Sequence, residues 1–188
     1  SATAGPSPTL TPTRTESATP TETPYQSPTP TLPCTPVRLW FQQGVLPETA
    51  YNGVSDTYIN IDDPTVSYGT SAVLRMKNDA NGGVRPLLRF DLSLIPPGSY
   101  IESATLHLAQ DTYKKNDLFD STVGLYRLRR HWTAAEATWQ RAVVGQAWTV
   151  AGADGALDRE LLPVSTLFVE RCSEWRWRLF PVREAVQG

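Results

Sequence analysis

The chain has 188 residues, enough for one domain of good size plus an extension, and its formal net charge is only −2. The near balance of 17 Lys and Arg against 19 Asp and Glu argues against nucleic acid or an anionic membrane as a partner, because both need a basic patch. No apolar run approaches the roughly 20 residues of a spanning helix, so no membrane insertion is expected.

Residues 1–36 form a Thr/Pro-rich stalk or arm with eleven Thr, four Ser and nine Pro. Proline fixes φ and removes a hydrogen-bond donor, and little apolar surface offsets the entropy of ordering, so an extended spacer is expected. Thr and Ser beside Pro are typical of O-glycosylated stalks, and the alternative is an unmodified linker. The candidate O-glycosylation sites are Thr9, Thr11, Thr13, Thr15, Thr19, Thr21, Thr23, Thr29, Thr31 and Thr35.

Only two cysteines occur, Cys34 and Cys172, and they lie far apart in the sequence. In a reducing compartment they would be two small hydrophobic residues, whereas in an oxidising one they are a candidate disulfide. Because the stalk argues for export, we predict the disulfide and an extracellular or cell-surface location. Closing so long a loop would stabilise the fold by roughly 4–5 kcal/mol.

Residues 37–188 contain short runs in which apolar and polar residues alternate, separated by Gly, Pro, Asn and Asp. This pattern predicts an all-β domain, an antiparallel β-sandwich. In one run Leu106 and Leu108 are expected to face inward and His107 outward. The expected strands are 37–43, 56–61, 72–77, 85–93, 104–110, 123–129, 147–150, 167–172 and 175–180, and 133–139 is the one stretch compatible with a helix.

The motifs of common catalytic sites are absent, since no HExxH, GxSxG or GxxxxGK[ST] phrase occurs. We therefore expect no catalytic residues, no enzyme activity and no catalytic metal. Structural calcium is the one candidate cofactor, held by loop carboxylates at Asp62 and Asp63 or at Asp154 and Asp158.

Six tryptophans are many for this length. Trp175 and Trp177 share one face of an expected strand, with Arg176 and Arg178 on the other. The favoured interpretation places both tryptophans in the core. The alternative is that they stack on sugar rings while arginine binds a sugar carboxylate.

The phrase HWTAAEATW contains two further tryptophans, Trp132 and Trp139. Both are expected to be core or corner residues. Glu136, between them, is expected to make a structural hydrogen bond to the backbone rather than to act as an acid or base.

Several phrases in order resemble a known family: DTYI, SYG, LLRFDLS before IP, and SATLHL. From about Val37 to Gly188 the chain is similar to the DNRLRE-type β-sandwich domain of exported bacterial proteins, which is related to alginate-type carbohydrate-binding modules. The resemblance implies a jelly-roll-like sandwich carried on stalks, enzymes or surface proteins, without one fixed activity.

The resemblance also implies further strands after a Val-Gln-Gly phrase, whereas this sequence ends at Val186-Gln187-Gly188. An incomplete sequence is one explanation, and a sandwich lacking its last strands is the other. The second leads to the main hypothesis, a non-catalytic extracellular fibre subunit in which the N-terminal arm of one copy fills the sandwich of the next. The prolines of the arm favour edge or groove docking over a central donor strand.

The second hypothesis for the function is a carbohydrate-binding module for an acidic polysaccharide, carried on a glycosylated linker. The partner is then a polysaccharide rather than other copies of the chain in a homopolymer. An exposed row of two or more aromatic residues on one sheet face would favour this hypothesis.

Overall fold

The computed structural model describes residues 35–77, 83–111, 120–170 and 175–187. The chain divides into two units, Ser1–Arg38 and Leu39–Gly188, and the second contains all the described strands. Cys34, Cys172 and the candidate glycosylation sites up to Thr31 lie outside the described residues. Thr35 is described and is exposed.

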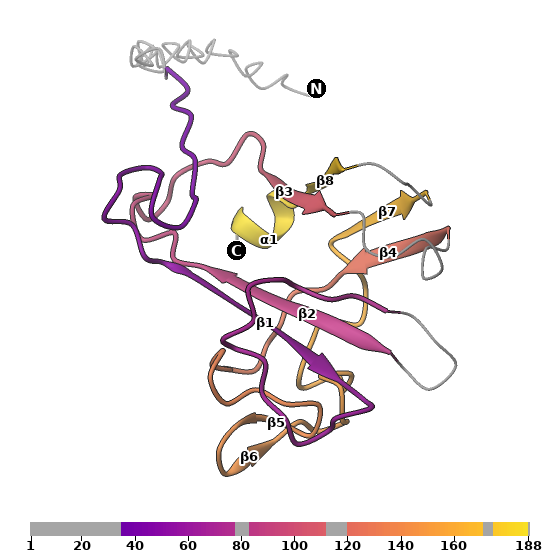
Figure 1. Ribbon diagram of the computed structural model, residues 1–188. Helices are drawn as coiled ribbons and strands as arrows, with labels where there is room; N and C mark the ends of the chain where they lie inside the picture. The colour runs from indigo at the N-terminus through magenta and orange to yellow at the C-terminus, as the bar shows by residue number, and fades with distance from the viewer. Residues whose placement is uncertain (1–34, 78–82, 112–119, 171–174, 188) are drawn as a thin grey trace, which may run out of the picture. The chain divides into compact units, whose positions relative to one another are not determined.

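The described strands of the second unit pair antiparallel, as the alternation predicted (Figure 1). The pairs are β1 with β2, β3 with β8, β4 with β7, and β5 with β6. The predicted all-β class is therefore confirmed, and the pairing is consistent with a β-sandwich. The strands are β1 (Val54–Asn60), β2 (Val84–Phe90), β3 (Thr105–Gln110), β4 (Ser121–Leu125), β5 (Arg141–Val143), β6 (Gln146–Ala147), β7 (Ser165–Val169) and β8 (Arg176–Pro181).

The hydrophobic core joins one face of β1 and β2 to the segment 132–153. Trp132 and Trp139 are both buried there, which confirms the sequence prediction for them. Trp148 is also buried, and its indole nitrogen donates a hydrogen bond of 2.9 Å to the Thr138 carbonyl, as a buried indole requires. The buried cluster consists of Ile59, Leu87, Trp132, Ala137, Trp139, Ala142, Trp148 and Ala153.

Two arginines cover tryptophan rings at the margin of this core. Arg85 and Arg89 flank Leu87 at alternate positions of β2, so all three point to the same side of the strand pair. The Arg85 guanidinium lies 5.1 Å from the ring centroid of Trp139, and that of Arg89 lies 5.6 Å from Trp132. These cation–π contacts explain how charged residues share the strand face that carries the core.

The inner face of β2 is the one that carries Arg89. Leu88 and Phe90 lie on one face of the strand and Arg89 on the other, and Leu87, on the Arg89 face, joins the buried cluster. Leu88 and Phe90 are half-buried, so neither face of β2 is fully open. When both faces are covered, alternation alone does not identify the inner one.

The one described helix, α1 (Arg183–Gln187), lies where no helix was expected. Two of its side chains bind the loop that precedes β3. Arg183 Nε donates to the Ile101 carbonyl at 2.7 Å, and Gln187 Oε1 accepts from the Ile101 amide at 2.7 Å. The expected helical stretch 133–139 instead begins with a turn at residues 134–136. No described helix has the length and hydrophobicity of a membrane-spanning segment.

Two expected strands are also missing from the described residues, and of a third, 147–150, only Ala147 belongs to a strand, β6. Segment 37–43 carries only an isolated bridge from Gln42 to Leu46, and segment 72–77 only one from Lys77 to Val84. An alternating pattern of polar and apolar residues therefore does not by itself form a strand in these two segments, because a strand also needs a neighbouring strand along its length.

Candidate functional site

The outer face of the β3–β8 pair carries an aromatic row, defined as Trp40, His107, Trp177 and Trp175. Each ring contacts the next edge to face. The centroids of Trp40 and His107 are 5.5 Å apart, those of His107 and Trp177 are 6.2 Å apart, and those of Trp177 and Trp175 are 5.0 Å apart. The row therefore joins the segment before β1 to both strands of the pair.

Strand register places these rings together. Ala109 of β3 pairs with Trp177 of β8, and His107 pairs with Leu179, so His107 and Trp177 are diagonal neighbours on one face. Ala109 contributes only a methyl group opposite Trp177. Because the pair joins residues about seventy positions apart, the sequence separates what the sheet brings into contact.

The tryptophans of the row are exposed, which corrects the favoured prediction that Trp175 and Trp177 belong to the core. The exposed fractions are 53% for Trp175, 54% for Trp177 and 50% for Trp40. An exposed tryptophan cluster leaves apolar area in water, which makes the row a candidate binding surface.

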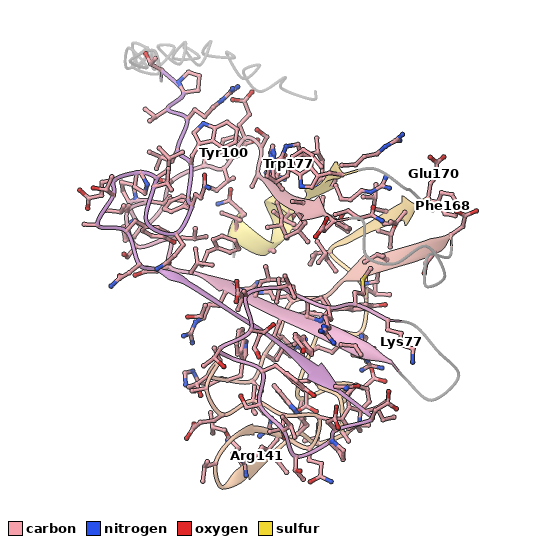
Figure 2. The ribbon with its side chains drawn as sticks, in the orientation of Figure 1. Lys77, Tyr100, Arg141, Phe168, Glu170 and Trp177 are labelled. Atoms are coloured by element: carbon pink, nitrogen blue, oxygen red, sulfur yellow. The ribbon has the colours of Figure 1, made fainter. Side chains whose placement is uncertain are left out.

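The arginines of β8 lie on the opposite face from the row. Arg178 points toward the interior, where its Nε donates to Gln110 Oε1 at 2.6 Å and its Nη2 to the Glu170 carbonyl at 3.1 Å. Arg176 pairs with Gln110 along the same face. Figure 2 shows Trp177 in the upper part of the molecule, with Phe168 and Glu170 at the far end of β7. Arg176 and Arg178 are thus not placed to bind a ligand that stacks on Trp175 and Trp177.

A second candidate site is an open cleft of about 490 Å³ at the margin of β1 and β2. Its most basic group is the exposed Arg89, whose Nη1 donates to the Trp132 carbonyl at 3.3 Å and whose Nη2 donates to Ser55 Oγ at 3.4 Å. Within the described part of the chain no carboxylate lies within ion-pair distance of Arg89. The cleft is lined by Asn52, Gly53, Ser55, Arg89, Phe90, Asp91 and Leu92.

Asp91 gives the same cleft a hydrogen-bond acceptor. Its Oδ1 accepts from the Ser93 amide at 2.9 Å, and the hydrogen bonds from Ser93 lower the pKa of Asp91 below its ordinary value. Gly53 lies against it, since a Cβ on Gly53 would come within 2.7 Å of the Asp91 Cβ. The cleft can thus offer a fixed cation and a fixed anion to one polar ligand.

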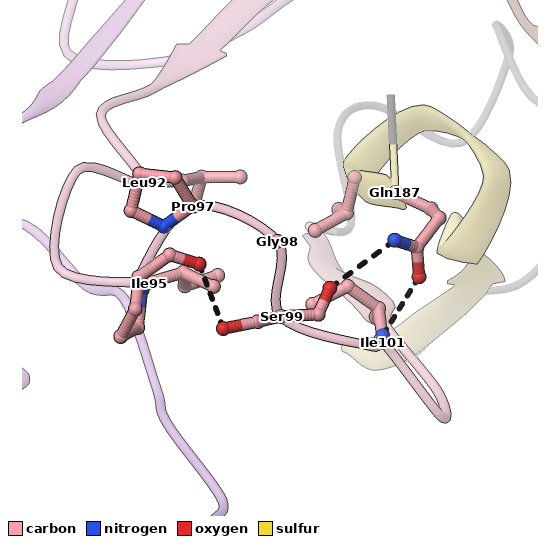
Figure 3. A pocket seen from close by; sticks show the side chains of 9 residues that line it. Leu92, Ile95, Pro97, Gly98, Ser99, Ile101 and Gln187 are labelled. Atoms are coloured by element: carbon pink, nitrogen blue, oxygen red, sulfur yellow. Dashed lines mark hydrogen bonds between the residues drawn. The ribbon is translucent and has the colours of Figure 1, made fainter.

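A smaller cavity of about 280 Å³ lies beside α1 (Figure 3). Gln187 closes one side of it, donating from Nε2 to the Ser99 carbonyl at 3.2 Å and accepting from the Ile101 amide. Ser99 Oγ donates to the Pro96 carbonyl at 2.7 Å. The polar groups drawn around this cavity are therefore engaged with one another, and the rest of the lining is largely apolar, so it is the weaker candidate.

Asp158 is a buried carboxylate that organises the loop before β7. Its Oδ1 accepts from Arg130 Nε at 2.7 Å and from the Thr149 amide at 3.0 Å, and its Oδ2 accepts from Thr149 Oγ1 at 2.6 Å. The amides of Val150 and Gly155 also donate to Asp158 Oδ2, at 3.1 and 3.2 Å. Burial raises the pKa of Asp158, but hydrogen bonds from Thr149, Val150 and Arg130 outweigh this effect and lower it to about 2.

These contacts bear on the predicted calcium site. Asp158 is surrounded by protein donors, and Asp154 pairs with Arg159 at 2.6 Å and with Arg85 at 3.5 Å. In the part of the chain that the structure describes, no group of three or more His, Cys, Asp or Glu side chains is arranged to hold a metal ion. Calcium at Asp62 and Asp63 stays a prediction.

Glu136 has a structural contact, but a different one from that expected. Its Oε2 accepts a hydrogen bond of 3.1 Å from Thr133 Oγ1, a side chain rather than the backbone. Thr133 and Glu136 are three residues apart, the spacing of a capping box, although the segment forms only a turn.

Sequence reasoning missed two members of these sites, Trp40 and Arg89. His107 was correctly expected to face outward, and Trp177 was named as a possible stacking residue, but Trp40 was not foreseen, because only its tertiary contact with His107 brings it into the row. Arg89 was not singled out either, because its cleft forms only where the loop before β1 and the loop after β2 meet at one end of the strand pair.

A sequence model of carbohydrate-binding module family 96 matches residues 47–151, which is more than half of the chain. The matched range contains the buried tryptophans, His107 and the Arg89 cleft. Trp40, Trp175 and Trp177 lie outside it. No curated protein and no solved structure shows a significant match to the chain.

Proposed function

Since the chain belongs to carbohydrate-binding module family 96, we propose that it is a non-catalytic module that binds a polysaccharide through the aromatic row. The family is one of binding modules, which agrees with the lack of catalytic motifs in the sequence. The row then supplies the contact surface and the rest of the fold holds it in place.

The observation that carries this proposal is the exposure of the row. Three tryptophans, each about half exposed, lie in continuous ring contact with His107 on one sheet face. Indole rings stack well on the apolar faces of sugars, and a large exposed apolar area is otherwise unfavourable in water. An exposed row of aromatic residues on one sheet face favours carbohydrate binding over self-assembly.

Replacing Trp177 with alanine is expected to weaken polysaccharide binding by at least about tenfold. Trp177 contacts both His107 and Trp175, so its removal interrupts the row at its centre. A buried interface tryptophan commonly contributes about 2 kcal/mol, and 1.4 kcal/mol is a factor of ten. Affinity electrophoresis in gels containing soluble polysaccharides measures the change.

Phe168→Ala is the matched control for Trp177→Ala. Phe168 is an exposed aromatic residue of β7, with 57% of its surface accessible, and it makes no ring contact with the described aromatic residues. Its removal should leave binding unchanged. Equal losses from both variants would mean that general surface hydrophobicity, rather than the row, retains the polysaccharide.

An acidic polysaccharide is the finer proposal for the ligand, and the Arg89 cleft supports it. An exposed guanidinium with only long hydrogen bonds is free to take a carboxylate in a bidentate contact. Asn52 and Asp91 beside it offer partners for sugar hydroxyls. The cleft volume of about 490 Å³ falls within the usual size of small-ligand sites.

Arg89→Lys is expected to weaken binding of polygalacturonate by about tenfold and to leave binding of a neutral β-glucan unchanged. Lysine keeps the charge but loses the planar fork that fits a carboxylate, and the lost charge-assisted bond accounts for the size of the effect. The urea midpoint of the variant controls for loss of the Trp132 contact. Equal losses for both polymers would argue against a carboxylate contact at Arg89.

Several finer hypotheses accompany the proposed function. Kinship with DNRLRE-type and alginate-type domains, export to the cell surface, glycosylation of the stalk and the Cys34–Cys172 disulfide are proposals of this kind. The fibre-subunit hypothesis has no support from the fold or the comparisons, so carbohydrate binding takes its place as the leading function.

A further inference from the structure

The rings of the aromatic row are tilted strongly against one another at every step. The planes of Trp175 and Trp177 meet at 76°, those of Trp177 and His107 at 71°, and those of His107 and Trp40 at 67°. Neighbouring aromatic rings prefer such edge-to-face contacts because of their quadrupoles. No two consecutive rings of the row can therefore lie in one plane.

This tilt limits what can stack on the row. The flat face of a polysaccharide crystal presents many parallel sugar rings in one plane, and it can rest only on aromatic rings that share a plane. A single chain can rotate about its glycosidic bonds, so that successive sugars turn their faces toward differently oriented rings.

We propose that the aromatic row binds one flexible glycan chain at a time and does not bind the face of a crystalline polysaccharide. The inference rests on the proposed function and specifies the physical form of its ligand. The steps between ring centroids, 5.0 to 6.2 Å, are comparable with the length of one sugar residue in a chain.

The strands hold this tilted geometry in place. Trp177 lies opposite Ala109 in the β3–β8 register, and His107 lies between Trp40 and Trp177 with ring contacts on both sides. Flattening the row would break these edge contacts.

The charged side chains of β8, among the described residues, lie on the face opposite the row. Arg176 and Arg178 point to the other side of β8, so His107 is the one titratable member of the row. Binding there depends on stacking and ring orientation, and moderate salt should not release the chain from the row.

The test compares soluble and crystalline probes with the full chain. Isothermal titration uses soluble polygalacturonate, alginate and barley β-glucan and their hexasaccharides, and depletion assays use microcrystalline cellulose and crystalline chitin. We expect measurable binding to at least one soluble polymer and its hexasaccharide, and no depletion by either crystalline solid. Trp40→Ala and Trp177→Ala should each lower the affinity about tenfold, whereas Phe168→Ala should not.

The contrary outcomes separate the two levels of the proposal. Depletion by a crystalline solid that Trp177→Ala abolishes, without binding to any soluble polymer, would overturn single-chain binding and leave the carbohydrate function intact. Binding that none of the row variants alters, or no binding to any probe, would overturn the aromatic row as the binding surface and the inference with it.

Discussion

Replacing Asp158 with alanine is expected to lower the free energy of unfolding by about 3–5 kcal/mol, the usual cost of breaking a buried ion pair from one side. The carboxylate is fully buried and accepts hydrogen bonds from Arg130, Thr149, Val150 and Gly155. Without it, a mostly buried guanidinium and several amides lose their acceptor at once. Urea denaturation followed by tryptophan fluorescence measures the loss.

Asp154→Ala is the matched control, because Asp154 also pairs with arginine but is partly exposed to solvent. Exposed and half-exposed ion pairs contribute about 0–1 kcal/mol, so this variant should change stability little. If both variants lost the same free energy, burial of the Asp158 network would not be what stabilises the loop.

The same carboxylate should make the fold sensitive to acid. The pKa of Asp158 in the folded protein is about 2, below its ordinary value of 3.8, so the ionised form stabilises the fold above pH 4. That contribution, about 2 kcal/mol, is lost as the pH falls from about 4 to about 2. Asp158→Asn should be less stable at pH 7 and should show a weaker dependence on pH across this window.

The orientation of side chains within several strands could be predicted because alternation is a local property. Leu106 and Leu108 face inward and His107 outward, as the pattern of that run required. The pairing of strands is not local, and it decides which rings meet. His107 and Trp177 lie close only because β3 and β8 pair in one register, which no local pattern shows.

The orientation of β8 shows a second limit. Polar and apolar residues alternate clearly there, and hydrophobicity favoured Trp177 inside with Arg178 outside. The structure reverses this order because Gln110 and the Glu170 carbonyl satisfy the Arg178 guanidinium on the inner side. A half-buried arginine with hydrogen-bond partners is tolerated, so alternation identified the two faces of β8 but not which of them faces water.

The short helix was missed for a related reason. Five residues are too few for a clear helical period, and α1 is held by the side-chain bonds of Arg183 and Gln187 to the loop at Ile101. Conversely, the Ala-rich segment around Glu136 has good helix formers, but tertiary packing of Trp132 and Trp139 holds its ends in the core.

Replacing Trp139 with alanine is expected to lower the free energy of unfolding by about 3–5 kcal/mol, the range for deleting a large aromatic side chain from a core. Trp139 is only 8% exposed, and the Arg85 guanidinium lies over its ring, 5.1 Å from the ring centroid. Gly152 packs against it so closely that an added Cβ would lie 2.7 Å from the ring, and the Gly152 amide donates to the Trp139 carbonyl at 2.7 Å. The cavity left by alanine would have no side chain at Gly152 to fill it.

Trp177→Ala is the informative comparison, because it deletes the same side chain from an exposed position. It should cost less than about 1 kcal/mol of stability, since most surface substitutions change stability little, while it weakens polysaccharide binding. Trp139→Ala, measured at a temperature where it remains folded, should retain binding to the aromatic row. If Trp177→Ala destabilised the fold as strongly as Trp139→Ala, the row would be part of the core rather than a surface available to a glycan.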